Sequence, residues 1–132
     1  MRKIFLFLLV LAGCSTSPTT YNDHEGRFTL EYPPEWAVTE SSSEVQFWDT
    51  LETDPSIKMV LFENPDIEFT AETTINNLSA MIRSGTFMSD FQVYYYDLGD
   101  LVISFTAYYE AEAPGHHDQV TEIQESFRAK TL

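Results

Sequence analysis

The hydrophobic positions after residue 26 follow two different spacings, and these spacings predict the secondary structure. Apolar and polar side chains alternate in residues 27–32, which is typical of a strand with one face in water. The Pro33-Pro34 pair cannot donate ladder hydrogen bonds, so we expect the strand to end there. Further strands are predicted at residues 45–48, 57–62, 91–96 and 101–109.

Two other stretches show the spacing of amphipathic helices. The first is predicted to begin at Thr70 and to end at Gly85, with an apolar stripe of Ala71, Ile75, Leu78 and Ile82. The second is predicted to be capped by Asp118, with a stripe of Val120, Ile123 and Phe127. A short turn at residues 97–100 should join the last two strands into a hairpin. This order predicts an α+β fold, an antiparallel sheet flanked by helices, with about five strands and two helices.

The first residues have the layout of a secretory signal. Met1-Arg2-Lys3 is short and basic, residues 4–11 are apolar, and Leu11-Ala12-Gly13-Cys14 places two small residues before a thiol. The apolar run is far shorter than the ~20 residues that cross a bilayer. The segment resembles the lipobox of prokaryotic lipoproteins, which implies cleavage before Cys14 and acylation of that cysteine. We therefore expect a signal peptide at 1–13, a lipidated cysteine and flexible tether at 14–26, and one globular domain at 27–132.

The net charge of the chain limits the classes of molecule that it can bind. The chain has a formal net charge of −14, and loss of Arg2 and Lys3 with the signal makes it −16. Such a surface repels nucleic acid and anionic lipid headgroups. The sequence therefore excludes nucleic acid as a partner, and we expect membrane contact through the lipid alone.

The start of the predicted domain resembles a known family. Phe28, then Tyr32-Pro33, then Trp36 follow the opening pattern of PsbP-like domains, which include extrinsic photosystem subunits. Ile123 and the Ser-Phe pair that ends at Phe127 resemble the family's closing pattern. The resemblance implies an α/β/α sandwich, an antiparallel sheet between helices. A photosynthetic role does not follow, because the matched residues concern core packing.

One cluster of side chains contains potential metal ligands. His116, His117 and Asp118 offer two imidazoles and a carboxylate, which are potential ligands of a divalent metal. The alternative is a solvated loop that leads into the last helix, and Asp23-His24-Glu25 in the tether is a weaker cluster of the same kind. Aromatic runs at residues 94–96 and 108–109 must place rings on both sheet faces, so the outer rings either form a binding platform or lie beneath a helix.

The residues match no phosphate-binding loop and no motif that activates a nucleophile. We therefore expect a non-enzymatic, cofactor-free lipoprotein of the cell envelope, acting as a binding or assembly module with an envelope protein partner. The alternative is a metal-binding or metal-delivery lipoprotein that uses His116, His117 and Asp118. Ser15 after the cysteine favours the outer membrane in a two-membrane bacterium, and otherwise the outer face of the cell membrane.

The lipid anchor yields a direct prediction. In wild-type cells the protein should enter the detergent phase, whereas Cys14→Ser should leave an uncleaved precursor because the thiol that accepts the lipid is missing. Detergent partitioning and the mass of the N-terminal peptide measure both. Normal cleavage of the variant, with release of a soluble domain, would contradict the anchor.

Overall fold

The chain folds mainly into β-structure. The computed structural model describes residues 17–49, 56–64, 66–87, 89–110 and 112–130, and these form ten strands and one helix. The elements are β1 (Thr19–Asn22), β2 (Phe28–Tyr32), β3 (Ala37–Glu40), β4 (Glu44–Trp48), β5 (Lys58–Glu63), β6 (Thr73–Ile75), β7 (Leu78–Phe87), β8 (Ser89–Asp97), β9 (Val102–Tyr109), α1 (His116–Glu125) and β10 (Arg128–Ala129).

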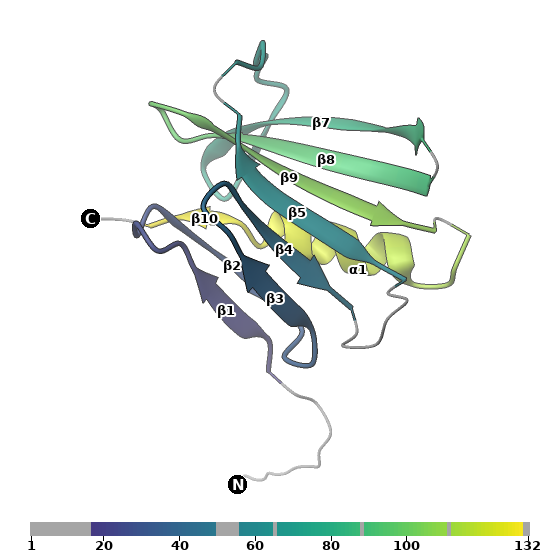
Figure 1. Cartoon of the computed structure of the whole chain (residues 1–132). Helices are drawn as coiled ribbons and strands as arrows, with labels where there is room; N and C mark the ends of the chain where they lie inside the picture. Colours follow the sequence, from purple (N-terminus) through teal and green to yellow (C-terminus); the bar gives the residue numbers. More distant parts are fainter. Residues whose placement is uncertain (1–16, 50–55, 65, 88, 111, 131–132) are drawn as a thin grey trace, which may run out of the picture.

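The strands build two antiparallel sheets. The larger has seven strands in the order β3-β4-β5-β9-β8-β7-β6, and the smaller has three in the order β1-β2-β10. In Figure 1, α1 lies behind β4, β5 and β9, on the face of the large sheet that is turned away from the viewer. The small sheet lies beside α1, which contacts both β2 of the small sheet and β9 of the large sheet. The core therefore sits between the large sheet on one side and α1 with the small sheet on the other.

Alternation along each strand explains which side chains enter this core. Met59 and Leu61 on β5 and Phe105 and Ala107 on β9 are buried, and the registers place them opposite one another. Phe47 on the neighbouring β4 is also fully buried. The same parity turns the intervening residues of these strands to the opposite face.

A buried amide fixes the helix on the sheet. The Gln124 side chain is fully buried in α1, and its Nε2 donates to the backbone oxygens of Gln92 at 2.9 Å and Phe105 at 2.8 Å. Its Oε1 accepts a hydrogen bond from Gln92 Nε2 at 2.8 Å. The Tyr96 hydroxyl donates to the Gln124 backbone oxygen. These bonds join α1 to β8 and β9, and they satisfy polar groups that would otherwise destabilise the interior.

The predicted five strands are present as β2, β4, β5, β8 and β9, but the fold class predicted from sequence is wrong. The stretch predicted as the first helix forms the β6–β7 hairpin, with Ile75 opposite Leu78. Asn76 and Asn77 have φ of 52° and 69°, as a two-residue type I′ turn requires. The described residues therefore contain one helix, and an α/β/α sandwich with helices on both faces is not formed.

Gly85 does not stop a helix, because it lies inside β7. It stands opposite Phe91, and a Cβ at Gly85 would come within 3.0 Å of the Phe91 ring. The predicted turn after β8 is confirmed: Gly99 has φ of 101°, and its N–H donates to the Asp97 carboxylate at 2.8 Å. The β6–β7 hairpin thus takes the place of the helix predicted from Thr70 to Gly85 and extends the sheet.

Two further expectations need correction. Residues 19–22 fall within the predicted flexible tether, yet they form β1, which pairs with β2, and Tyr21 is buried. The N-cap of α1 is Gly115, and Asp118 instead lies in the first helical turn. The stretch of residues 19–22 is too short for its alternation to predict a strand. The pairing of β1 with β2 stabilises it.

The residues of the family resemblance lie in the core or against it. Phe28, Trp36 and Phe127 are buried, and Tyr32 packs against the core beside the half-buried Pro33. The Phe127 ring stacks on Tyr96 at 4.3 Å between centroids, and on Phe28 at 4.7 Å. Phe127 therefore joins β8, β2 and the end of α1.

Phe127→Ala should lower the free energy of unfolding by about 3–5 kcal/mol, because it removes a fully buried ring from between two others. His116→Ala, in the first turn of α1, should change it little. Denaturant titration of the soluble domain measures both. Equal stability of wild type and Phe127→Ala would contradict this account of the core.

Candidate functional site

The face of the large sheet that points away from α1 is the first candidate surface. We call it the open face, and it comprises the side chains of β4, β5, β9, β8 and β7 that alternate with the core residues. No helix among the described residues covers it, and Figure 1 shows it turned to the viewer. Of the two alternatives for the outer rings of residues 94–96 and 108–109, cover by a second helix is therefore not found among the described residues.

One row of the open face is aromatic across four strands. Trp48 on β4 stands opposite Lys58 on β5, which stands opposite Tyr108 on β9, which stands opposite Phe91 on β8. The Lys58 ammonium nitrogen lies 4.8 Å from the Trp48 ring centroid, within cation–π range. Tyr108 is 40% exposed, and the other three side chains are half-buried. The row ends at Gly85, whose missing side chain leaves room for the Phe91 ring.

The remaining rows are mixed in character. Glu44, Phe62, Ser104, Tyr95 and Met81 form one further row, in which Ser104 and Met81 are buried. Thr106 and Val93, in the row between, are also buried. Five basic residues follow residue 13, and two of them, Lys58 and Arg83, lie on the open face. The Arg83 guanidinium contacts the exposed Glu72 carboxylate at 2.7 Å, which lowers the Glu72 pKa. The open face thus carries aromatic rings and two cations together with the acidic Glu44.

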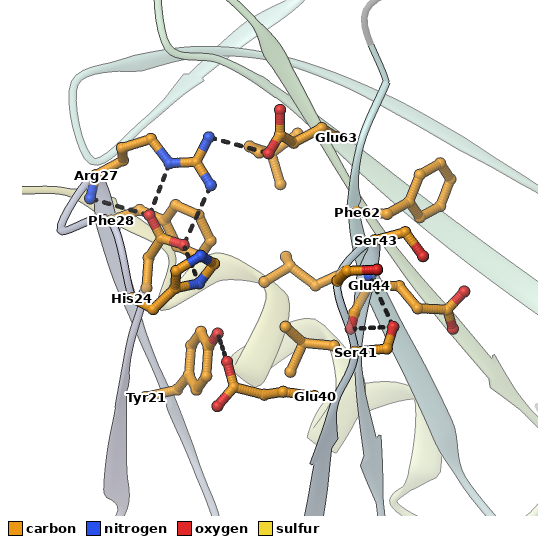
Figure 2. A pocket seen from close by; sticks show the side chains of 15 residues that line it. Tyr21, His24, Arg27, Phe28, Glu40, Ser41, Ser43, Glu44, Phe62 and Glu63 are labelled. Atoms are coloured by element: carbon orange, nitrogen blue, oxygen red, sulfur yellow. Dashed lines mark hydrogen bonds and ion pairs between the residues drawn. The ribbon is translucent and has the colours of Figure 1, made fainter.

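The second candidate is a cleft between the two sheets (Figure 2). Its walls come from the β1–β2 turn, the β3–β4 turn and β5. Asp23, whose side chain is only 4% exposed, accepts hydrogen bonds from Arg27 Nε at 2.7 Å, Nη2 at 3.2 Å and backbone N–H at 3.1 Å. Arg27 Nη1 also donates to Glu63 on β5 at 3.2 Å. The guanidinium therefore bridges the small sheet and the large one.

Charge and burial explain the protonation states in this cleft. Burial acts to raise the Asp23 pKa, but the hydrogen bonds from the Arg27 side chain and backbone outweigh it and hold the pKa below its ordinary value. The same bonds raise the pKa of Arg27. Burial, followed by the hydrogen bond to Glu40 at 2.8 Å, raises the pKa of Tyr21. Asp23 and Arg27 thus stay charged and Tyr21 stays neutral at neutral pH.

The geometry makes the cleft a structural clamp. Only about 40 Å³ of its space can hold the centre of a water molecule, whereas ligand pockets typically measure ~300–1,000 Å³. The Arg27 guanidinium donates hydrogen bonds to the carboxylates of Asp23 and Glu63, and the Tyr21 hydroxyl donates to the Glu40 carboxylate. These groups hold the β1–β2 hairpin against β3 and β5.

The predicted metal ligands are not brought together. His116, His117 and Asp118 occupy the first turn of α1, where successive side chains point in different directions. His117 Nδ1 lies 2.9 Å from the Tyr109 hydroxyl. Among the described residues, no group of three or more histidine, cysteine or acidic side chains is placed to hold a metal ion. Cys14 lies outside the described residues.

Comparison with known proteins supports the fold alone. No family model matches the chain, and no curated protein matches it. A solved crystal structure from Bacteroides thetaiotaomicron VPI-5482 is similar in fold, with a TM-score of 0.54 and 11% sequence identity over 85% of this chain. This chain spans about half, 48%, of the length of that one. The resemblance to PsbP-like domains stays a prediction.

Sequence reasoning missed parts of both candidates. Asp23 and Arg27 were divided between a tether and a strand, although their four-residue separation around Gly26 is a signal for a turn that one ion pair could close. Once Phe47 and Met59 are assigned to the core, the alternation of side chains along each strand places their neighbours Trp48 and Lys58 on the opposite face. What the sequence could not indicate was that their face stays open.

The Asp23–Arg27 ion pair predicts in which direction the stability of the domain changes with pH. Arg27→Met keeps part of the apolar stem but leaves the buried Asp23 carboxylate unpaired, so stability at pH 7 should fall by on the order of 3 kcal/mol. In wild type, the contribution of Asp23 is present above its unfolded pKa of about 3.8 and is lost as pH falls through the lower folded value. In Arg27→Met, burial without a partner should raise the folded pKa of Asp23, so the deficit should shrink as pH falls.

Urea titration between pH 7 and pH 3 measures this difference. The control is the double variant Asp23→Asn with Arg27→Met. It has no buried carboxylate that lacks a partner, so it should recover most of the stability at pH 7. A deficit of the single variant that is the same at every pH would contradict the role given to Asp23.

Proposed function

We propose that this chain is a lipid-anchored, non-catalytic binding module of the cell envelope, and that it holds an envelope protein partner on the open face. The observation that supports this most is the row of Trp48, Lys58, Tyr108 and Phe91, which lies across four strands of a face that no described helix covers. Tyr108 is the exposed large hydrophobic side chain among the described residues, and Trp48 and Phe91 in its row are half-buried. Aromatic residues are enriched at the centres of protein interfaces.

The rest of the described structure agrees with a binding role. The charged groups of the inter-sheet cleft hold two sheets together, and the buried polar groups of α1 hold the helix on the sheet. No described helix is long and apolar enough to span a bilayer. The metal-binding alternative gains no support from the described geometry of His116 and His117.

The open face can be tested by crosslinking in native membranes. A photoreactive phenylalanine analogue replaces the exposed Tyr108 in the lipidated protein. If a partner lies on the open face, illumination should give a defined adduct. Adding Lys58→Glu should reduce the adduct several-fold, because it reverses the charge in the centre of the row.

Arg128→Glu is the matched control, because it reverses an exposed cation of β10 in the small sheet. It should leave the adduct unchanged, and circular dichroism should show that both variants are folded. An adduct that is equally insensitive to both substitutions, or equally sensitive to both, would contradict the open face as the binding surface.

A further inference from the structure

The position of β1 limits how far the domain can lie from its lipid. β1 begins at Thr19, directly after Pro18, so only four residue steps separate Pro18 from Cys14. Four steps span at most about 14 Å in a fully extended chain. A domain of this size has a radius of gyration of about 13 Å, so its far side lies well beyond that reach. If Cys14 carries the lipid, only the surface around Pro18 can lie against the membrane.

A groove occupies that surface. Pro18, Pro33 and Pro34 line it on one side and α1 on the other, and its volume is about 310 Å³. We call it the anchor-side groove. Glu31 and Glu122 contribute carboxylates to it, and no lysine or arginine is among the described residues that line it. Its chemistry is therefore apolar and anionic.

In contrast to the sequence-based expectation of membrane contact through the lipid alone, we propose that the anchor-side groove faces the bilayer and contacts a zwitterionic headgroup layer, with lipid ammonium groups against Glu31 and Glu122. This rests on the lipid anchor in the proposed function. Two observations support it: the short span from Cys14 to Pro18, and the complementarity between the groove's carboxylates and an ammonium headgroup. Without basic residues in its lining, the groove has no attraction for anionic lipid.

This orientation has a consequence for the open face. β1 begins at the lower edge of the molecule in Figure 1, while the open face is turned to the viewer. A membrane below β1 therefore leaves the open face pointing sideways, accessible to a protein anchored in the same membrane. The anchor would thus set the angle at which the domain presents its binding surface.

Cys14 is the only cysteine of the chain, and acylation occupies its thiol, so an introduced cysteine can carry a single spin label. Pro34→Cys places the label at the groove, and Ser42→Cys places it in the β3–β4 turn at the opposite end of β3; both positions are exposed. The lipidated full chain is reconstituted in vesicles of phosphatidylethanolamine and phosphatidylcholine that contain a nickel-chelating lipid. The nickel should enhance relaxation several-fold more at position 34 than at position 42.

Equal enhancement at the two positions, or more at position 42, in protein that stays attached would overturn the orientation and leave the anchor intact. Failure of the cleaved wild-type chain to attach to vesicles would overturn the anchor itself. Replacing phosphatidylethanolamine by phosphatidylglycerol should lower the enhancement at position 34, and Glu31→Gln with Glu122→Gln should weaken this lipid dependence. An enhancement that rises with phosphatidylglycerol would overturn the headgroup assignment.

Discussion

The buried amide of Gln124 is the interaction on which the rest of the structure depends. It binds carbonyl oxygens of β8 and β9 and the Gln92 amide, and it holds α1 against the centre of the large sheet. A single helix can cover only one face of such a sheet. By fixing which face is covered, Gln124 also determines which face is left for another molecule. The end of the same helix is held by Asn76, whose side chain donates to the backbone oxygens of Glu125 at 2.8 Å and Phe127 at 2.9 Å.

These contacts connect the fold to the proposed function. The covered face carries most of the buried apolar residues, and the opposite face carries, beside the buried Met81 and Val93, aromatic rings and the cations Lys58 and Arg83. The ion pair of Asp23 and Arg27 holds β1 beside β2 and β5, so the chain enters the domain at a defined point. The core thus leaves the open face without a helix, and the Asp23–Arg27 ion pair fixes where the chain enters the domain, next to the proposed anchor.

Local pattern was sufficient to predict the strands whose alternation is regular, such as β2 and β9, and the C-terminal helix around Val120 and Ile123. It failed at β6 and β7, because Ile75, Leu78 and Ile82 also fit a helical stripe. The two asparagines between Ile75 and Leu78 were the missed turn signal, and the register with β8 that stabilises β7 is a long-range contact that local spacing does not contain. The open face could not be predicted for the same reason, because an error of one helix changes which face is covered.

The central claim is that a partner covers the open face when the protein is in its native envelope. Hydroxyl-radical footprinting tests it most directly, by comparing oxidation of Tyr108 and Trp48 in intact membranes and in the purified soluble domain. His24, whose side chain is 71% exposed and lies outside the open face, serves as the internal reference. The account predicts that Tyr108 and Trp48 are protected in membranes relative to the purified domain while His24 is equally oxidised in both. Equal oxidation of Tyr108 in the two samples would contradict it.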